Sequence, residues 1–283
     1  MKIKISADSI CDLPPELIAK YGIGIVPLSI VKGGQPFRDM VEITPQDIFD
    51  YVESGAGSCH TTAVNVSEYA ELFAEYLKEY DAVIHTTISS VISCCHQNAL
   101  IAAADLPNVY VIDSLNLSSG SGQLVLDAAI MAERGSPADE IAERVNQLAK
   151  YVESSFVIDT LKYLHKGGRC SGLAALGANL LKLKPCIEVT DGKMDVGKKY
   201  RGNFDKVILQ YVADKLQGRD DIDPRRIFVT YAPGTPQEVV DSVTDAIRAL
   251  GYFQEILTSL AGCTISNHCG PVCLGLLYYR KQG

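Results

Sequence analysis

The chain of 283 residues carries 34 acidic and 26 basic side chains, a net charge of −8, and 47% of its residues are hydrophobic. The length is that of about two domains, the apolar content excludes a disordered chain, and the acidic balance argues against a nucleic-acid binder. No apolar run approaches the roughly 20 residues of a membrane span, and the N-terminus is unlike a signal peptide. We therefore expect a cytoplasmic protein without stable membrane insertion.

The first half of the chain alternates strands with helices. Strands are predicted at 3–7, 23–31, 82–86 and 109–112, and helices at 14–20, 44–53, 67–79, 93–104, 121–133 and 137–152. Thr44 precedes Pro45 and is the expected N-cap of the second helix. Such alternation is typical of a parallel sheet with helices on both faces. We predict a Rossmann-like α/β domain over residues 1–152.

The second half has a different pattern. Asp191-Gly192 is a two-residue hairpin signal between predicted strands at 185–190 and 193–198. Further strands are expected at 227–231, 253–257 and 272–279, with a helix at 235–250. Hairpins mixed with helices indicate an α+β domain whose sheet is mostly antiparallel. We predict this second domain over residues 153–283.

Nine cysteines occur without even spacing and without a C-x-x-C pair. In a chain of this size such thiols are typically reduced and buried. The group Cys263, His268, Cys269 and Cys273 is the nearest to a metal-ligand pattern, but its spacings are not those of a zinc knuckle. We predict no metal site and no cofactor.

Hydroxyl-bearing residues follow the predicted strands of the first half at 6–9, 86–90 and 113–114, and precede a helix at 118–122. Ligands of open parallel sheets bind beyond the carboxyl ends of the strands, and hydroxyls and N–H groups at helix starts favour anions. The alternative for each segment is that Ser and Thr only cap helices. Together the segments indicate a site for an anionic head group. The sequence lacks G-x-G-x-x-G and a P-loop, so nucleotide binding has no support.

The segment 162–201 carries nine basic and three acidic residues in an otherwise acidic chain. A basic patch of this kind can hold a phosphate or an acidic partner surface, whereas the alternative is a solvated face without a ligand. Within the segment, Gly167 and Gly168 allow close approach of the backbone, and Arg169 offers a bidentate fork for a carboxylate or a phosphate.

His268 lies in a predicted loop just before the last strand. It can act as a base, as a hydrogen-bond donor to an anion, or as a structural residue. A Ser–His–Asp hydrolase would combine it with Ser93 and Asp113, but the G-x-S-x-G sequence is absent. Cys95 or Cys269 beside His268 is the alternative thiol nucleophile. A small-molecule hydrolase or acyltransferase is therefore the alternative function.

Seven blocks of the chain match, in order, the motifs of one known family. The most specific block is Tyr163-Leu164-His165-Lys166-Gly167-Gly168-Arg169. The other six are Asp8-Ser9 with Cys11-Asp12-Leu13; Thr61-Thr62; Ser89-Ser90-Val91-Ile92-Ser93 with Gln97-Asn98-Ala99; Asp113-Ser114 with Gly120-Ser121-Gly122; Lys184-Pro185 with Asp191-Gly192 and Lys199-Tyr200-Arg201; and His268-Cys269-Gly270-Pro271. Over essentially its whole length the chain resembles the DegV family, the bacterial fatty-acid-binding proteins.

This resemblance implies a carrier, not an enzyme, with a long-chain fatty acid buried in a tunnel between two domains and presented to a separate fatty acid kinase for acyl phosphate formation. It also implies the residues of the site: Thr61 or Thr62 and Ser93 on the carboxylate, His268 and Arg169 close to it, and Arg201 near a transferred phosphate or the partner. Several hydrogen-bond donors are what a buried carboxylate requires, so this set of residues is consistent with the implied ligand. A chain of about 16 carbons, at about 0.8 kcal/mol per CH₂, gains roughly 12 kcal/mol from burial before the costs of binding.

The chain departs from the family pattern close to this site. Ala63-Val64 replaces Gln-Pro, and Cys94-Cys95 replaces Gly-Thr after Ser93. Cys170 stands in place of an aliphatic residue, and Cys269 in place of Thr. A cysteine in place of glycine is expected to reshape the turn beside the carboxylate. A third reading is a regulatory or scaffold protein that binds another anionic metabolite.

Overall fold

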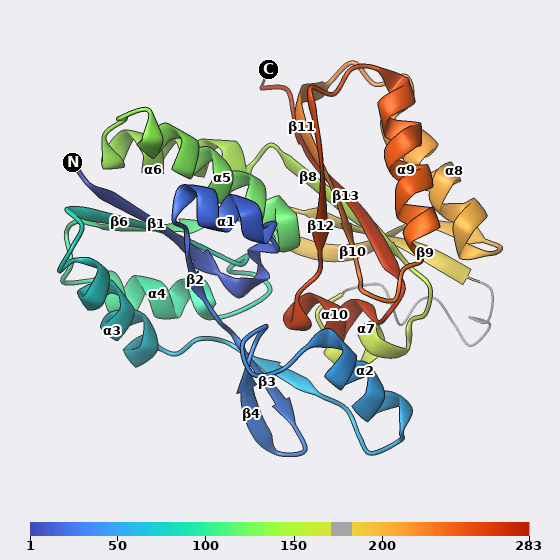
Figure 1. The fold of residues 1–283 in the computed structure, drawn as a ribbon, viewed down its shortest axis with the longest axis horizontal. Helices are drawn as coiled ribbons and strands as arrows, with labels where there is room; N and C mark the ends of the chain where they lie inside the picture. The colour runs from blue at the N-terminus through green and yellow to red at the C-terminus, as the bar shows by residue number, and fades with distance from the viewer. Residues whose placement is uncertain (171–182, 283) are drawn as a thin grey trace.

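The computed structural model describes residues 1–170 and 183–282 and contains two large sheets with helix α5 packed between them (Figure 1). The first sheet has four parallel strands in the order β2 (Gly24–Val26), β1 (Ile3–Asp8), β6 (Ala82–Thr87) and β7 (Val109–Asp113). All six residues of β6 are buried, because helices cover both faces of the sheet. On one side lie α1 (Pro15–Tyr21), α5 (Ser118–Glu133) and α6 (Ala138–Ala149), and on the other α3 (Val66–Tyr76) and α4 (Cys95–Ala103).

The second sheet belongs to the C-terminal half of the chain. Its order is β10 (Lys193–Arg201), β9 (Leu183–Thr190), β8 (Val152–Ile158), β13 (Cys273–Arg280), β11 (Ile222–Tyr231) and β12 (Glu255–Leu260). Only the pair β11–β12 is parallel among these described strands, so the sheet is mixed and mostly antiparallel. Helices α8 (Phe204–Leu216) and α9 (Gln237–Leu250) cover its outer face, and α5 packs on the inner face.

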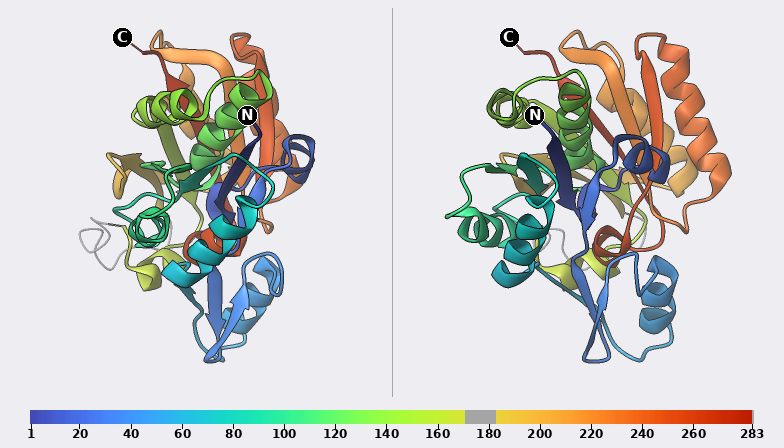
Figure 2. Two further views of the ribbon diagram at one scale, coloured as in Figure 1. Left: turned by 90° about the vertical axis from the view of Figure 1, so that its left-hand side faces the viewer. Right: turned by 60° about the vertical axis from the view of Figure 1, so that its left-hand side comes forward.

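A third, small sheet joins the two halves. It consists of β4 (Gln35–Arg38), β3 (Ser29–Lys32) and β5 (His60–Thr62), and with α2 (Pro45–Glu53) it lies at the lower end of the molecule in Figures 1 and 2. Its apolar side chains pack against two helices of the C-terminal half, α7 (Lys162–Gly167) and α10 (Cys263–Cys269). The shared cluster includes Ile30, Phe49, Tyr163 and Cys263. Residues 29–62 therefore belong to the first half of the chain but pack on the second.

The structure confirms the predicted α/β class, the parallel first sheet and the mostly antiparallel second sheet. The hairpin at Asp191-Gly192 forms between β9 and β10, and Thr44 caps α2 by accepting a hydrogen bond from Asp47 N at 3.3 Å. The predicted strand 23–31 is wrong, because the chain breaks into β2 and β3 on either side of Pro27, which has no N–H to donate to a ladder. Helix α5 begins earlier than expected, at Ser118.

The sequence patterns gave no indication of β4, β5, β8, α7, α8 or α10, and the helix predicted at 137–152 ends at Ala149. β8 begins at Val152, and the division of the chain into domains 1–152 and 153–283 stays a prediction. Within the two described stretches, no helix has both the length and the apolar composition needed to cross a bilayer.

Candidate functional site

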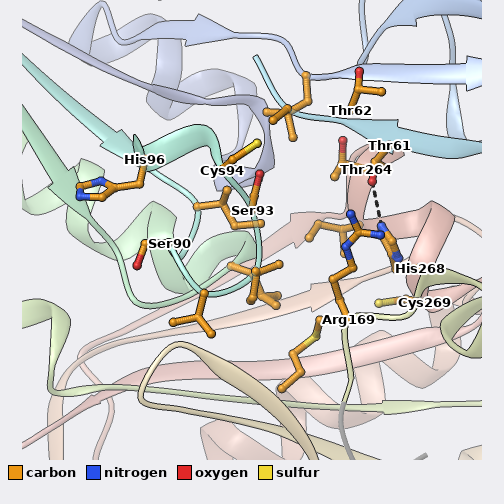
Figure 3. Close-up of a pocket in the computed structure, with 18 of the residues that line it drawn as sticks. Thr61, Thr62, Ser90, Ser93, Cys94, His96, Arg169, Thr264, His268 and Cys269 are labelled. Atoms are coloured by element: carbon orange, nitrogen blue, oxygen red, sulfur yellow. Dashed lines mark hydrogen bonds between the residues drawn. The ribbon is translucent and has the colours of Figure 1, made fainter. Parts of the chain in front are cut away.

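A pocket of about 430 Å³ opens where the two halves of the chain and the small sheet meet (Figure 3). This volume is in the range of small-molecule sites. Most of its wall is apolar, and Leu28, Ile88, Leu117, Phe156, Leu164 and Ile265 contribute to it. Polar side chains also line it, and Figure 3 shows Thr61, Arg169 and His268 together on one side and Ser90, Ser93 and His96 on the other.

All five residues predicted to contact the carboxylate line this one pocket: Thr61, Thr62, Ser93, Arg169 and His268. They come from four separate segments of the chain. The two threonines end β5, Ser93 precedes α4, Arg169 follows α7, and His268 lies in the last turn of α10. Tertiary folding alone brings these segments together.

Arg201 does not line the pocket. It is exposed at the end of β10, where its backbone pairs with Leu183. Several other bases of segment 162–201 are ion-paired, including Lys184 with Asp159 and Lys198 with Asp214. Lys182 lies outside the described residues. The segment is therefore less cationic in the fold than in the sequence.

His268 is the best-defined polar group of the site. It lies on a helix, which corrects the expectation of a loop. Its Nε2 is 3.1 Å from Thr61 Oγ1, while Nδ1 is buried without a hydrogen-bond partner among the described residues. Burial, and secondly the positive charge of Arg169, lower the pKa of His268 to about 4. The imidazole is therefore neutral at pH 7 and can donate one hydrogen bond.

Gly167 explains how His268 is positioned. A Cβ atom at residue 167 would lie 2.1 Å from His268 Nδ1. The backbone of α7 thus approaches the imidazole more closely than any other amino acid allows. The next residue, Gly168, ends α7 in a left-handed conformation with φ of 65°. The two glycines of the Lys-Gly-Gly-Arg sequence therefore have different roles. Gly167 allows close contact with His268, and Gly168 lets the chain turn where α7 ends.

The loop of residues 88–94, here called the β6–α4 loop, carries Ser93. Ser93 Oγ accepts a hydrogen bond from Cys95 N at 3.3 Å and donates to Cys95 Sγ at 3.2 Å. At the start of the loop, Ile88 N donates to the buried carboxylate of Asp8 at 3.0 Å. Ser90 N donates to Asp113 Oδ1 at 3.1 Å. The loop is thus held by carboxylates that end two strands of the first sheet.

Helix α10 carries His268 and is held at its other end by two acids. Gly262 N donates to Asp12 Oδ1 at 2.9 Å, and Cys263 N donates to Asp39 Oδ1 at 2.9 Å. Thr264 Oγ1 donates to Asp39 Oδ2 at 2.6 Å. These bonds satisfy N–H groups that have no partner within the helix.

Comparison with known proteins agrees with this architecture. The profile of the DegV family, whose members are described as uncharacterised, matches residues 2–281. A DegV domain-containing protein of Caldanaerobacter subterraneus subsp. tengcongensis is 32% identical over 283 residues, 99% of each chain. The chain belongs to the DegV family.

Two solved structures with the same fold are those of fatty-acid-binding proteins. A DegV family protein of Thermus thermophilus, known for fatty acid binding, is 30% identical with a TM-score of 0.87, covering 99% of this chain and 100% of its own. A stearic-acid-binding protein of Eubacterium ventriosum is 25% identical with a TM-score of 0.81, covering 99% of this chain and 98% of its own.

The hydroxyl-rich segments of this DegV chain do not all reach the pocket. Ser90 and Ser93 line it, whereas Ser118 and Ser119 are buried in α5. Ser118 donates to Asp12 at 2.5 Å, and Ser119 pairs with Thr230 of the second sheet. Of the four segments, only 86–90 thus contributes a hydroxyl to the pocket wall, and Ser6 and Ser9 bond to His85 and Asp39 instead.

The cysteines that depart from the DegV pattern surround the same region. Cys94 and Cys269 line the pocket, and Cys95 lies directly beneath Ser93. Burial raises the pKa of Cys95 to about 12, and the nearby charge of Asp8 contributes in the same direction. A thiol with so high a pKa is a poor nucleophile at neutral pH. Over the described residues, no three His, Cys, Asp or Glu side chains are grouped so as to hold a metal ion.

Proposed function

We propose that this DegV protein is a cytoplasmic carrier that binds a long-chain fatty acid in the pocket, between the two halves of the chain. The observation that carries the proposal is that one mostly apolar pocket is also lined by the hydrogen-bond donors Thr61, Thr62, Ser93, Arg169 and His268. The fatty-acid binding of the Thermus and Eubacterium relatives supports the same ligand class.

The polar side chains suit a carboxylate. Thr62 and Ser93 each supply a hydroxyl donor, and Thr61 and neutral His268, which share one hydrogen bond, keep one further donor between them. Arg169 supplies the positive charge. A carboxylate has about four acceptor sites and loses its hydration on entering the pocket, so it needs several such donors at once. We assign these five residues to the carboxylate.

The acyl chain has an apolar path away from these donors. A second, narrower cavity shares Leu117, Phe156, Ile265 and Cys269 with the main pocket. It continues between the sheets toward Cys273, Gly275 and Leu277. We propose that the end of the chain follows this path, because apolar surface buried there gains free energy in proportion to its area.

The carrier would present the carboxylate to a separate fatty acid kinase, which forms the acyl phosphate. The exposed position of Arg201, outside the pocket, supports a role in contact with phosphate or with that partner. Arg201→Ala should therefore leave fatty-acid affinity nearly unchanged and lower the rate of phosphorylation by a cognate kinase. An equal loss of fatty-acid affinity would assign Arg201 to binding instead.

The alternative of a hydrolase or acyltransferase finds little support in the geometry. His268 Nε2 pairs with Thr61, and Ser93 Oγ pairs with Cys95, so within the described residues no hydrogen bond joins Ser93 or a cysteine to His268. Asp113 Oδ1 accepts from Ser90 N and Leu115 N, not from His268. A catalytic triad requires the base to reach both partners.

The test compares stearate with octadecanol on the parent protein and on Ser93→Ala. Removing one donor from a buried carboxylate costs roughly 1–3 kcal/mol, so stearate affinity should fall about 5- to 150-fold while octadecanol affinity changes little. Equal losses for both ligands would indicate damage to the pocket. Loss of ester turnover with unchanged stearate affinity would favour the hydrolase. Native mass spectrometry of the purified parent should also show a bound fatty acid.

A further inference from the structure

Two cysteines lie along the path from the main pocket into the interior. Cys269 is the last residue of α10 and lines the main pocket (Figure 3). Cys273 is the first residue of β13 and does not line the main pocket. Both cysteines line the narrow apolar cavity that continues from the main pocket between the sheets. One thiol is therefore open to the main pocket, and the other lies deeper on the same path.

The two thiols are in contact with each other. The side chain of Cys273 is hydrogen-bonded to that of Cys269, and this bond, followed by burial, raises the pKa of Cys273 well above its usual range. Cys273 is therefore a protonated thiol, which can donate this bond to the sulfur of Cys269. Only residues 270–272 separate the two cysteines, and Gly270 turns the chain between them with a φ of 80°. A Cβ atom at Gly270 would lie 2.8 Å from the ring of Tyr163, so the turn is tightly packed.

The main pocket is the route by which a small oxidant reaches these thiols. Cys269 and Cys273 are only 5% and 6% exposed, so larger reagents reach them poorly. The pocket of about 430 Å³ has ample room for hydrogen peroxide, since a water molecule takes up about 30 Å³ of liquid. A ligand whose acyl chain runs from the main pocket into the narrow cavity passes Cys269, which lines both. Such a ligand covers the thiol that an oxidant would meet first.

We propose that Cys269 and Cys273 form a redox-active dithiol, which a peroxide entering the empty pocket converts to a disulfide and which a bound acyl chain protects. The protection rests on the proposed binding of fatty acids, whereas the disulfide of the ligand-free protein does not. Cys269 stands where the DegV pattern has Thr, so the dithiol belongs to this chain and not to that pattern.

The oxidation takes place in two steps. The sulfur of Cys269 attacks one oxygen of hydrogen peroxide and the O–O bond breaks, which gives a sulfenic acid and one water. The sulfur of Cys273 then attacks the sulfenic sulfur and the S–O bond breaks. The released hydroxyl takes the proton of the Cys273 thiol and leaves as a second water. Two thiols are thus oxidised to one disulfide while one peroxide is reduced to two waters, and a thiol reductant reverses the change.

The test follows the mass of the tryptic peptide 249–280, which contains both cysteines and Cys263. Protein stripped of lipid on a hydrophobic resin is treated with hydrogen peroxide at about pH 8.5, because the thiolate is the form that attacks. The remaining thiols are blocked with iodoacetamide before digestion. The variants are Cys269→Ser, Cys273→Ser and Cys263→Ser. Cys263 is the matched control, because it is a buried cysteine of the same helix and peptide that lines neither cavity.

We expect the peptide to lose the mass of two hydrogens in the ligand-free parent and in Cys263→Ser, and dithiothreitol to restore them. Cys269→Ser should show no loss, and Cys273→Ser should instead hold a sulfenic acid on Cys269 that dimedone labels. With stearate at about 100 times its Kd, only about 1% of the protein is empty, so disulfide formation should slow by up to about 100-fold. Thermal melting of each variant controls for folding.

Three results would overturn the proposal while fatty-acid binding stands. The first is oxidation of Cys269 to a sulfinic acid with no loss of two hydrogens, since Cys273 would then be out of reach. The second is a disulfide that joins Cys269 to Cys170 of another peptide, or one that still forms in Cys269→Ser. The third is an unchanged rate in protein that calorimetry shows to be loaded with stearate, because peroxide would then enter by another route. A protein that binds no stearate refutes the proposed function, while the disulfide of the ligand-free protein is decided by the first two results.

Discussion

The two walls of the pocket are both held by buried carboxylates, but from different parts of the molecule. The β6–α4 loop depends on Asp8, which also accepts a hydrogen bond from Tyr69 Oη at 2.6 Å and lies 3.2 Å from His85 Nε2. All of these groups belong to the first sheet and its helices. Helix α10 depends on Asp12 and Asp39, which reach it from the opposite half of the chain.

This difference indicates which wall can change position. The β6–α4 loop is continuous with the core of the first sheet, where Asp8, Tyr69 and His85 are fully buried. Helix α10 is seven residues long, and the bonds at its first turn come from Asp12 and Asp39 of the other half of the chain. Stability and ligand affinity should therefore respond differently to substitutions in the two walls.

The largest effect on folding is expected from Asp8→Ala. The substitution leaves the N–H of Ile88, the hydroxyl of Tyr69 and the ring of His85 without their acceptor in a fully buried site. We expect the free energy of unfolding, measured by urea denaturation, to fall by about 3–5 kcal/mol. Tyr69→Phe removes only one of the donors and should cost about 1 kcal/mol. Similar losses for the two variants would show that Asp8 does not anchor the loop.

The residues of the site could be predicted from the sequence, but the hydrogen bonds that hold its two walls in place could not. Thr61, Thr62, Ser93, Arg169 and His268 lie within short sequence blocks that resemble a known family. The bonds that hold the two walls join residues 80 and 250 positions apart, Asp8 to Ile88 and Asp12 to Gly262. A local sequence pattern cannot predict a hydrogen bond between residues so far apart in the chain. Helix α10 escaped prediction because its seven residues are too few for a recognisable periodicity and no proline marks its start, as Pro14 and Pro15 mark the equally short α1.

The second largest effect is expected on the pH dependence of stability, through Asp12 at the start of α10. Burial raises the pKa of Asp12 to about 8, although hydrogen bonds from Ser118 and Gly262 act in the opposite direction. In the unfolded chain the carboxyl titrates near its ordinary value of about 4, so between these values the folded state holds a proton that the unfolded state has lost. The contribution of Asp12 to stability is therefore greatest below about pH 4 and is lost as the pH rises to 8.

Asp12→Asn should remove this dependence, because the amide does not titrate. Between pH 5 and pH 8 the parent should lose up to about 4 kcal/mol more unfolding free energy than the variant. Urea denaturation at several pH values measures the difference. Parallel stability curves for the two proteins would contradict the raised pKa of Asp12.

His268, at the opposite end of α10, should make the stability of the protein decrease in acid. Because the pKa of His268 is lowered to about 4, the unfolded chain binds a proton below its ordinary pKa of about 6.5 while the folded protein does not. Stability of the ligand-free protein should therefore fall as the pH decreases from about 6.5 to 4. His268→Gln should reduce this loss of unfolding free energy between pH 6.5 and pH 4 by up to about 3 kcal/mol, measured in the same denaturation series. An unchanged loss would mean that His268 is charged in the fold.

A smaller effect, on affinity more than on stability, is expected at the contact between α7 and α10. Gly167→Ala places a methyl group 2.1 Å from His268 Nδ1, so the imidazole must shift and its bond to Thr61 is disturbed. Losing this donor should weaken stearate binding about 10-fold. Gly168→Ala is the matched control, because a Cβ atom there meets nothing within 4 Å. It should cost about 1 kcal/mol of stability from its positive φ and leave affinity unchanged. Equal affinities for the two variants would rule out the role given to Gly167.

The smallest effect is expected at the bond that links the β6–α4 loop to the second sheet. Ser89 is fully buried, and its Oγ donates to the carbonyl oxygen of Gly192, in the turn between β9 and β10, at 2.8 Å. Ser89→Ala should lower the free energy of unfolding by about 1 kcal/mol, since the bond is between neutral groups. Ser54→Ala removes a bond of the same kind, to Tyr51 O at 2.9 Å, from an exposed site, and water can replace that donor. It should cost close to nothing. If the two serines prove equal, the link between loop and hairpin contributes no more than a surface bond, and the β6–α4 loop is held by the first sheet alone.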